Sequence, residues 1–134
     1  MGFHLTIVTP QGASFDSEVD AVVLPGSEGD FGVLPDHERF LCPLRIGEVQ
    51  IQAGGTTTWA AVSSGFADVS GAQVAVLVDA CELASNIDVA RAEAALQRAE
   101  QALAEGADST EARVEQFEAA LDRARTRVAV GQRS

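Results

Sequence analysis

The spacing of apolar residues changes once along this chain, at Ser85, and this change limits the fold more than any other feature. Before it, apolar and polar side chains alternate, as Phe3, Leu5 and Ile7 do, which is the period of a half-buried strand. After it, apolar residues recur at intervals of three and four, the period of helices that pack on one another. The sequence therefore predicts a β domain over residues 1–84 and a helical unit over residues 85–134.

The first part contains several short runs with high strand propensity. Beyond the N-terminal run they are Ala21–Leu24, Val49–Ala53, Thr56–Val62, Phe66–Val69 and Gln73–Val78. Gly, Pro, Asp and Ser separate these runs at short intervals, which is typical of an antiparallel sandwich or barrel. No segment between them is long enough for a crossover helix, and this argues against a parallel sheet. We expect an all-β sandwich of antiparallel strands.

The second part predicts two helices with matching apolar seams. The seams are Val89, Ala92, Leu96, Ala99 and Leu103, then Val114, Phe117, Leu121, Ala124 and Val128. Between them, Gly106 suits the end of a helix, and Asp108 with Glu111 suits the start of the next. A short connector between matched seams predicts an antiparallel hairpin. Because the first seam is half alanine, the hairpin should be only weakly held and able to move.

Charge and composition exclude several classes of partner. The formal net charge is −11, and residues 1–83 hold eleven acids against only Arg39 and Arg45. Such a domain repels nucleic-acid phosphates and acidic membranes. The N-terminus lacks a signal-peptide pattern, and no apolar run approaches the ~18 residues that span a membrane, so we expect a cytoplasmic protein with no direct membrane insertion. Cys42 and Cys81 lie in apolar runs and are expected to be free thiols.

No catalytic or metal-binding pattern is present. His4 and His37 are the only histidines, and neither belongs to a His/carboxylate cluster at ligand spacing. Ser63 and Ser64 lack the nucleophile-elbow sequence that a hydrolase would place around them. The glycines at 26, 29 and 32 precede no helix, so they indicate turns rather than a phosphate loop. We expect a non-enzymatic protein without a metal or a required cofactor.

Three segments, taken in order, resemble a known family. They are residues 5–35, which include LTIVTP and PGSEGDFGVLP and precede His37; residues 62–79, which begin VSSGFADV; and residues 87–103, which open with IDVARA. Together they resemble the epsilon subunit of the bacterial F-type rotary ATP synthase, over nearly the whole chain. The run GDFGVLPDH is the most specific of the three.

The resemblance implies a ten-stranded β-sandwich followed by a helical hairpin. It also implies a non-catalytic place in the central rotor, at the cytoplasmic face of the bacterial inner membrane, where the sandwich binds the gamma subunit and the c-subunit ring. The residues expected at this gamma and c-ring interface are Glu28, Asp30, Phe31, Val33, Leu34 and His37. For Phe31, a place in the core beneath a turn is an equal alternative, because large aromatic side chains are usually buried.

In the same family the hairpin regulates ATP hydrolysis, and in some members it binds ATP through a motif that matches Ile87–Ala92 here. The resemblance implies a regulatory ATP held by Glu82, Ile87, Asp88, Arg91, Arg98, Arg123 and Arg127. Two plainer interpretations stay open. Asp88 is also a plausible helix cap, with the arginines as a solvated face. Alternatively, the arginines of the second helix contact the catalytic beta and alpha subunits when the hairpin extends.

Two other classes of protein are alternatives to the rotor subunit. A free-standing adaptor would dimerise through its helical seams, whereas a rotor subunit alone would be a monomer. A small β-barrel enzyme or carrier would need a ligand-sized cavity and a His/carboxylate cluster, and the sequence shows no such cluster.

Overall fold

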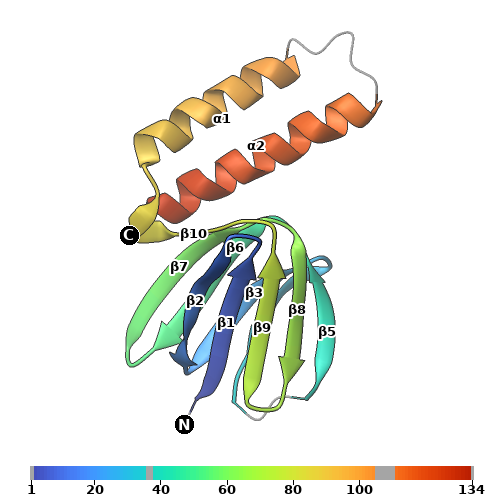
Figure 1. Cartoon of the computed structure of the whole chain (residues 1–134). Helices are drawn as coiled ribbons and strands as arrows, with labels where there is room; N and C mark the ends of the chain where they lie inside the picture. The colour runs from blue at the N-terminus through green and yellow to red at the C-terminus, as the bar shows by residue number, and fades with distance from the viewer. Residues whose placement is uncertain (1, 36–37, 105–110, 134) are drawn as a thin grey trace.

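The computed structural model describes residues 2–35, 38–104 and 111–133, and it places a strand domain below two long helices (Figure 1). The strands are β1 (Phe3–Thr9), β2 (Gly12–Val19), β3 (Ala21–Gly26), β4 (Gly29–Val33), β5 (Phe40–Leu44), β6 (Gly47–Ala53), β7 (Thr56–Val62), β8 (Gly65–Ser70), β9 (Gln73–Val78) and β10 (Cys81–Leu83). The helices are the 3-10 turn η1 (Ala84–Asn86), α1 (Val89–Ala104) and α2 (Glu111–Gly131). The predicted fold class, a β-sandwich followed by a helical hairpin, is confirmed.

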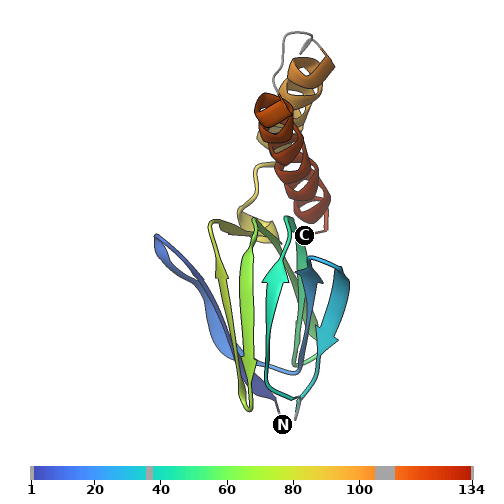
Figure 2. The ribbon, with the colours of Figure 1, turned by 90° about the vertical axis from the view of Figure 1, so that its right-hand side faces the viewer.

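The strands form one sheet that folds over into two layers. Along the sheet the order is β10-β7-β6-β3-β5-β8-β9-β1-β2, with β4 paired to the side of β3. A single bridge, Gly26 to Leu44, joins β3 to β5. The layer β5-β8-β9-β1-β2 therefore lies opposite the layer of β3, β4, β6, β7 and β10 (Figures 1 and 2).

One pairing differs from the antiparallel prediction. Among the described residues every strand pair is antiparallel except β1 and β9, which run parallel from His4 opposite Gln73 to Val8 opposite Leu77. The exclusion of parallel pairing assumed that a crossover needs a helix. Here the intervening strands of the domain make the connection instead, so the first strand lies next to the ninth.

The core lies between the two layers and follows the alternation seen in the sequence. On β1, Phe3, Leu5 and Ile7 are at most 1% exposed, while the residues between them are half-buried. Leu24 and Ile51 meet them from the opposite layer and are equally buried. Fully burying a side chain of this size stabilises the fold by roughly 1.5–3 kcal/mol. The sandwich is thus a rigid body, suited to present a surface of fixed shape.

The two helices run antiparallel, side by side, as a hairpin (Figure 1). On the predicted seams, Ala92 is completely buried and Leu121 and Ala124 are buried, whereas Leu96, Ala99 and Leu103 are half-buried. The side chains of Val114 and Phe117 and the predicted connector signals at 105–110 lie outside the described residues. The described seam is narrow and alanine-rich, which agrees with a hairpin that adds little stability of its own.

Candidate interaction surfaces

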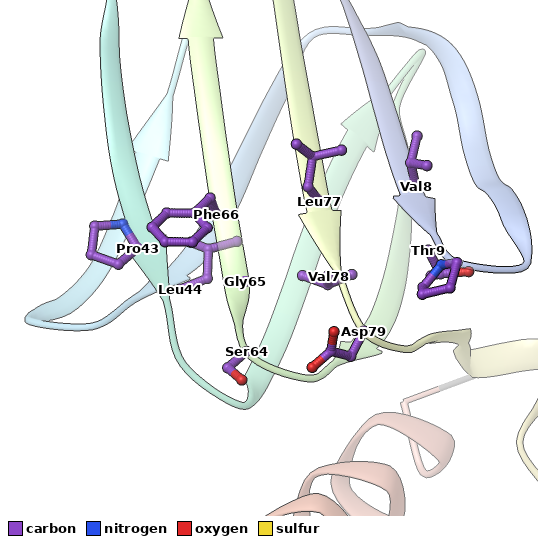
Figure 3. A pocket seen from close by; sticks show the side chains of 11 residues that line it. Val8, Thr9, Pro43, Leu44, Ser64, Gly65, Phe66, Leu77, Val78 and Asp79 are labelled. Atoms are coloured by element: carbon purple, nitrogen blue, oxygen red, sulfur yellow. The ribbon is translucent and has the colours of Figure 1, made fainter.

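Four strands carry an apolar row on the outer face of one layer. Val8, Leu77, Phe66 and Pro43 lie in register across β1, β9, β8 and β5. Figure 3 shows these side chains side by side. Phe66 is 52% exposed and Leu77 50%, and Leu41, two residues before Pro43 on the same face, is 67% exposed. We call Val8, Pro43, Phe66 and Leu77 the outer apolar row. Scattered exposed apolar residues are ordinary, but a continuous row marks a surface that a partner covers.

The outer apolar row lies in a shallow groove of about 710 Å³. Toward the helices this groove ends at the polar residues Thr9, Ser64 and Asp79 (Figure 3). Gly65 is required there, because any Cβ would clash with the backbone of β9 at Leu77 and Val78. Among the described lining residues there is no histidine, arginine or cysteine to act with Asp79. Apart from these polar residues at its end, the described lining of the groove is mainly apolar.

The predicted gamma and c-ring residues fall at different places around β4. Glu28 and Asp30 are exposed at the turn between β3 and β4. Phe31 is half-buried, packs against the core, and stands edge-on to Phe40 with ring centres 5.6 Å apart. The core interpretation of Phe31 is therefore supported in part, and its contact with a partner stays a prediction.

Of the other three residues of the predicted set, one lies in the core, one is exposed and one is not described. Val33 is only 2% exposed and belongs to the core, so its side chain offers no contact surface. Leu34 is 65% exposed, just after the end of β4. His37 lies outside the described residues. Because Asp30 and Leu34 stand at opposite ends of β4, the set forms two surfaces rather than one.

Arg45 braces the turn that carries Glu28 and Asp30. Its Nη1 donates to the carbonyl of Gly26 at 2.9 Å, and its Nη2 lies 2.6 Å from Oδ1 of Asp30. The backbone adds two bonds, Arg45 N–H to the Pro25 carbonyl and Ser27 N–H to the Pro43 carbonyl, both at 2.9 Å. One guanidinium thus ties both arms of the turn to the start of β6, which fixes the direction in which the acidic turn points.

The hairpin meets the sandwich at a small second core, which we call the root. It contains Ala61, Ala84, Ile87, Ala92 and Val130, with Trp59 and Val128 packed against it. Three of its buried members are alanines, each of which buries about one methyl group, worth about 0.8 kcal/mol. Burial at the root is therefore modest.

Three of the predicted ATP residues meet beside the root. Glu82 on β10 pairs with Arg127 on α2, and both line a cleft together with Arg123. The cleft holds only about 60 Å³, far below the ~300–1,000 Å³ of typical ligand pockets. In this arrangement the Glu82 carboxylate already pairs with Arg127, and the cleft is too small to hold a nucleotide.

The other predicted ATP residues lie outside that cleft. Ile87 is 8% exposed within the root. The Oδ1 atom of Asp88 accepts the backbone N–H of Arg91 at 3.1 Å, which is the bond of a helix N-cap. The side chains of Arg91 and Arg98 are exposed along α1. The structure gives Asp88 a capping role, and neither Arg91 nor Arg98 lines the cleft that Arg123 and Arg127 share.

Cys42 and Cys81 are free thiols, as predicted. Burial raises the pKa of the Cys81 thiol from 9.0 to about 11, and a hydrogen bond with Ser14 offsets only part of that rise. Within the described ranges no group of His, Cys, Asp and Glu is arranged to hold a metal ion, and no helix has the length and apolarity to cross a membrane.

Two features were missed at the level of sequence. The outer apolar row could be found by following the outward positions of neighbouring strands, where Pro43, Phe66 and Leu77 are all apolar. The second is a contact between the chain end and the sandwich, through Arg133 and Trp59. It joins residues too distant in the chain for any local pattern to indicate it.

A rigid sandwich with an apolar docking row, joined to a weakly rooted hairpin, defines a small two-domain protein that acts by binding partners. Comparison with known families agrees and is more specific. Residues 2–84 match the family profile of the ATP synthase delta/epsilon chain β-sandwich domain, and residues 85–132 match that of its long α-helix domain. The chain therefore belongs to the delta/epsilon-chain family of the ATP synthases, as the sequence resemblance predicted.

Curated relatives carry the same name over nearly their full length. The ATP synthase epsilon chain of Desulforamulus reducens is 42% identical over 125 residues, which cover 93% of each chain. That of Nitratidesulfovibrio vulgaris, strain DP4, is 46% identical over 128 residues, 95% of this chain and 93% of the relative. A chain in the structure of the Euglena gracilis mitochondrial ATP synthase, in an OSCP/F1/c-ring assembly, superposes with a TM-score of 0.81 at 26% identity and covers 96% of this chain and 80% of its own. The function of the chain is accordingly that of a rotor subunit of the ATP synthase.

Proposed function

We propose that this chain couples the gamma shaft of the F-type ATP synthase to the c-subunit ring and has no catalytic step of its own. Residues 1–84 are the gripping domain and residues 85–134 a regulatory hairpin. The outer apolar row carries this proposal, because it is a preformed protein-docking surface on a domain that has a rigid core. The assembled enzyme would hold the chain peripherally, at the cytoplasmic face of the membrane.

The gamma subunit is the partner that we assign to the outer apolar row. Phe66 and Leu77 stand at its centre, and Leu41 extends the apolar surface along β5. Residues 1–83 have a net charge of −9, from eleven acidic residues against two arginines. The matching surface on gamma should therefore be apolar at its centre and basic around its edge.

The c-ring is the partner that we assign to the acidic turn of Glu28 and Asp30. This turn projects from the sandwich at the end near the hairpin, and Arg45 holds its conformation. A held turn loses little conformational freedom on binding, which favours affinity. Leu34 stands at the other end of β4, away from this turn.

The hairpin is the part that we assign to regulation. Its root is small and alanine-rich, so lifting it from the sandwich breaks few contacts. A regulatory ATP would have to open the Glu82–Arg127 pair and widen the cleft before Arg123 and Arg127 could hold phosphates. When lifted, the exposed arginines of α2 would be free to contact the beta and alpha subunits.

Binding to purified gamma subunit tests the proposal. Phe66→Ser and Leu77→Ser should each weaken binding at least about tenfold, as expected for anchors at the centre of an interface. Gln52→Ser, at an exposed position on β6 of the opposite layer, is the matched control and should bind like the unmodified chain. Unchanged affinity in both groove variants would overturn the assignment of this face. A chain truncated after residue 85 should still bind, because the hairpin contributes nothing to the row.

A further inference from the structure

The end of the chain is clamped onto the sandwich by one arginine. Arg133 Nε lies 2.7 Å from Oε1 of Glu48 on β6, and its Cζ atom lies 3.9 Å from the centre of the Trp59 ring on β7. Glu48 and Trp59 are diagonal neighbours on one face of the sheet, because Trp59 pairs with Gln50. A single planar guanidinium thus forms an ion pair and a cation–π contact at the same time.

The residues just before Arg133 are also closely packed against the rest of the protein. Val130 is completely buried in the root. A Cβ at Gly131 would come within 2.9 Å of the methyl carbons of Ile87 and of Val89, so only glycine lets the end of α2 approach the start of α1 this closely. The last turn of α2 therefore ties the sandwich, the linker and both helices together at one point.

The rest of the hairpin leans away from the sandwich. Contacts between the described parts of the two domains run mainly through α2, which meets β6, β7 and β10, whereas α1 packs on α2 and stands farther from the strands (Figures 1 and 2). Apart from Arg127 and Arg133, the described residues form no ion pair that joins the hairpin to the sandwich. Docking of the hairpin thus rests on the root and on α2 from Arg127 onward.

We propose that Arg133, Glu48 and Trp59 form a C-terminal latch that sets how often the hairpin leaves the sandwich. Both ends of the latch are partly exposed, with 43% and 32% of the Arg133 and Glu48 side chains accessible. The latch is therefore weak enough to open. Salt or a competing carboxylate should weaken the Arg133–Glu48 ion pair and release the hairpin more often. The latch is a property of the isolated chain and does not depend on the proposed partners.

Amide hydrogen exchange on the full chain tests the latch. The probes are the amides of Gln132 and Arg133, bonded to the Val128 and Val130 carbonyls, and those along residues 121–131. Arg133→Gln and Trp59→Leu should each speed exchange there severalfold, and about tenfold when the two losses combine. Arg98→Gln, which removes an exposed arginine of α1, is the matched control and should change nothing.

Two further readouts separate a latch from simple loss of structure. Exchange within β8 and β9 should stay slow in every variant, because these strands contribute no residue to the root. Arg133→Lys keeps the charge but loses the planar stack on Trp59, so its exchange should fall between the unmodified chain and Arg133→Gln. If Arg133→Gln leaves exchange over residues 121–133 within twofold of the unmodified chain, there is no latch. A rise confined to Gln132 and Arg133 would equally overturn it, because that is end fraying alone.

Discussion

Arg127 on α2 grips Glu82 on β10 with two parallel bonds, Nε to Oε1 at 2.6 Å and Nη2 to Oε2 at 3.3 Å. The pair bridges positions 45 residues apart and closes the side of the cleft where Arg123 also lies. The guanidinium N–H groups that could bind a phosphate are therefore already bonded to the Glu82 carboxylate. Whatever binds Arg127 must first displace Glu82.

Glu82→Gln should therefore raise the affinity for ATP, because it removes the internal competitor for Arg127. Arg127→Ala should lower that affinity, because it removes the phosphate ligand. Calorimetry with ATP on the isolated chain gives both values, and Arg125→Ala is a control on the same helix outside the cleft. A loss of affinity in Glu82→Gln would instead make Glu82 a direct ligand of the nucleotide.

The main role of Asp88 should be that of the N-cap of α1. Asp88→Ala removes the bond to the Arg91 amide and should cost about 1 kcal/mol of α1 stability, seen as faster exchange of the first-turn amides. Asp88→Asn keeps an accepting oxygen and caps nearly as well, so it should leave exchange unchanged. If Asp88→Asn also abolishes ATP binding, the carboxylate has a second role as a ligand.

Substitutions of buried and of exposed sandwich residues should differ in their effects on the free energy of unfolding and on gamma binding. Ile7 is fully buried, and Ile7→Ala should cost about 2–5 kcal/mol in the free energy of unfolding. Leu77 lies on the outer face, and Leu77→Ala should cost less than 1 kcal/mol while weakening gamma binding. Urea unfolding and a binding titration on the same two variants provide the comparison. Similar stability losses in both would show that Leu77 is part of the core.

Alkaline pH should destabilise the chain through Cys81. Its pKa is about 11 when folded and 9.0 for an unperturbed thiol, so between these values the unfolded chain has lost a proton that the folded chain still holds. Stability from this group is complete below pH 9 and falls as the pH rises toward 11, by on the order of 2 kcal/mol. Unfolding measured from pH 8 to 11 should show a shallower fall in Cys81→Ala, whereas Cys42→Ala should retain the slope.

Sequence reasoning recovered the strands and helices whose buried faces repeat locally. The alternation of Phe3, Leu5 and Ile7 predicted β1, and the seam through Ala92 predicted α1. Strands β2, β4 and β5, and the three-residue β10, are not among the runs that the sequence predicts. β2 is largely exposed, β4 contains two glycines, and β5 contains Pro43, so each lacks the apolar repeat on which such predictions depend.

The candidate sites were predicted less completely, for a different physical reason. Glu82, Arg123 and Arg127 were named together and do meet, because a helical face and a nearby strand bring them close. Val33 is predicted to lie on the surface, yet its side chain points into the core. Successive side chains of a strand point to opposite faces, so the position of Val33 within β4 sets its direction. The pairing of Arg133 with Glu48 and Trp59 depends on the angle between two domains, and no residue spacing encodes that angle.

The parallel pairing of β1 with β9 has a consequence for how the domain is made. The first strand to leave the ribosome has two neighbours, and one of them, β9, is completed only at Val78. The edge of β1 that pairs with β9 must therefore stay without its backbone partner until almost the entire sandwich has been synthesised. Contacts between such distant segments slow folding and leave nascent chains prone to aggregate. The domain therefore reaches its complete pairing only after β9 has joined β1, so a nascent chain that stops before Val78 should stay incompletely folded.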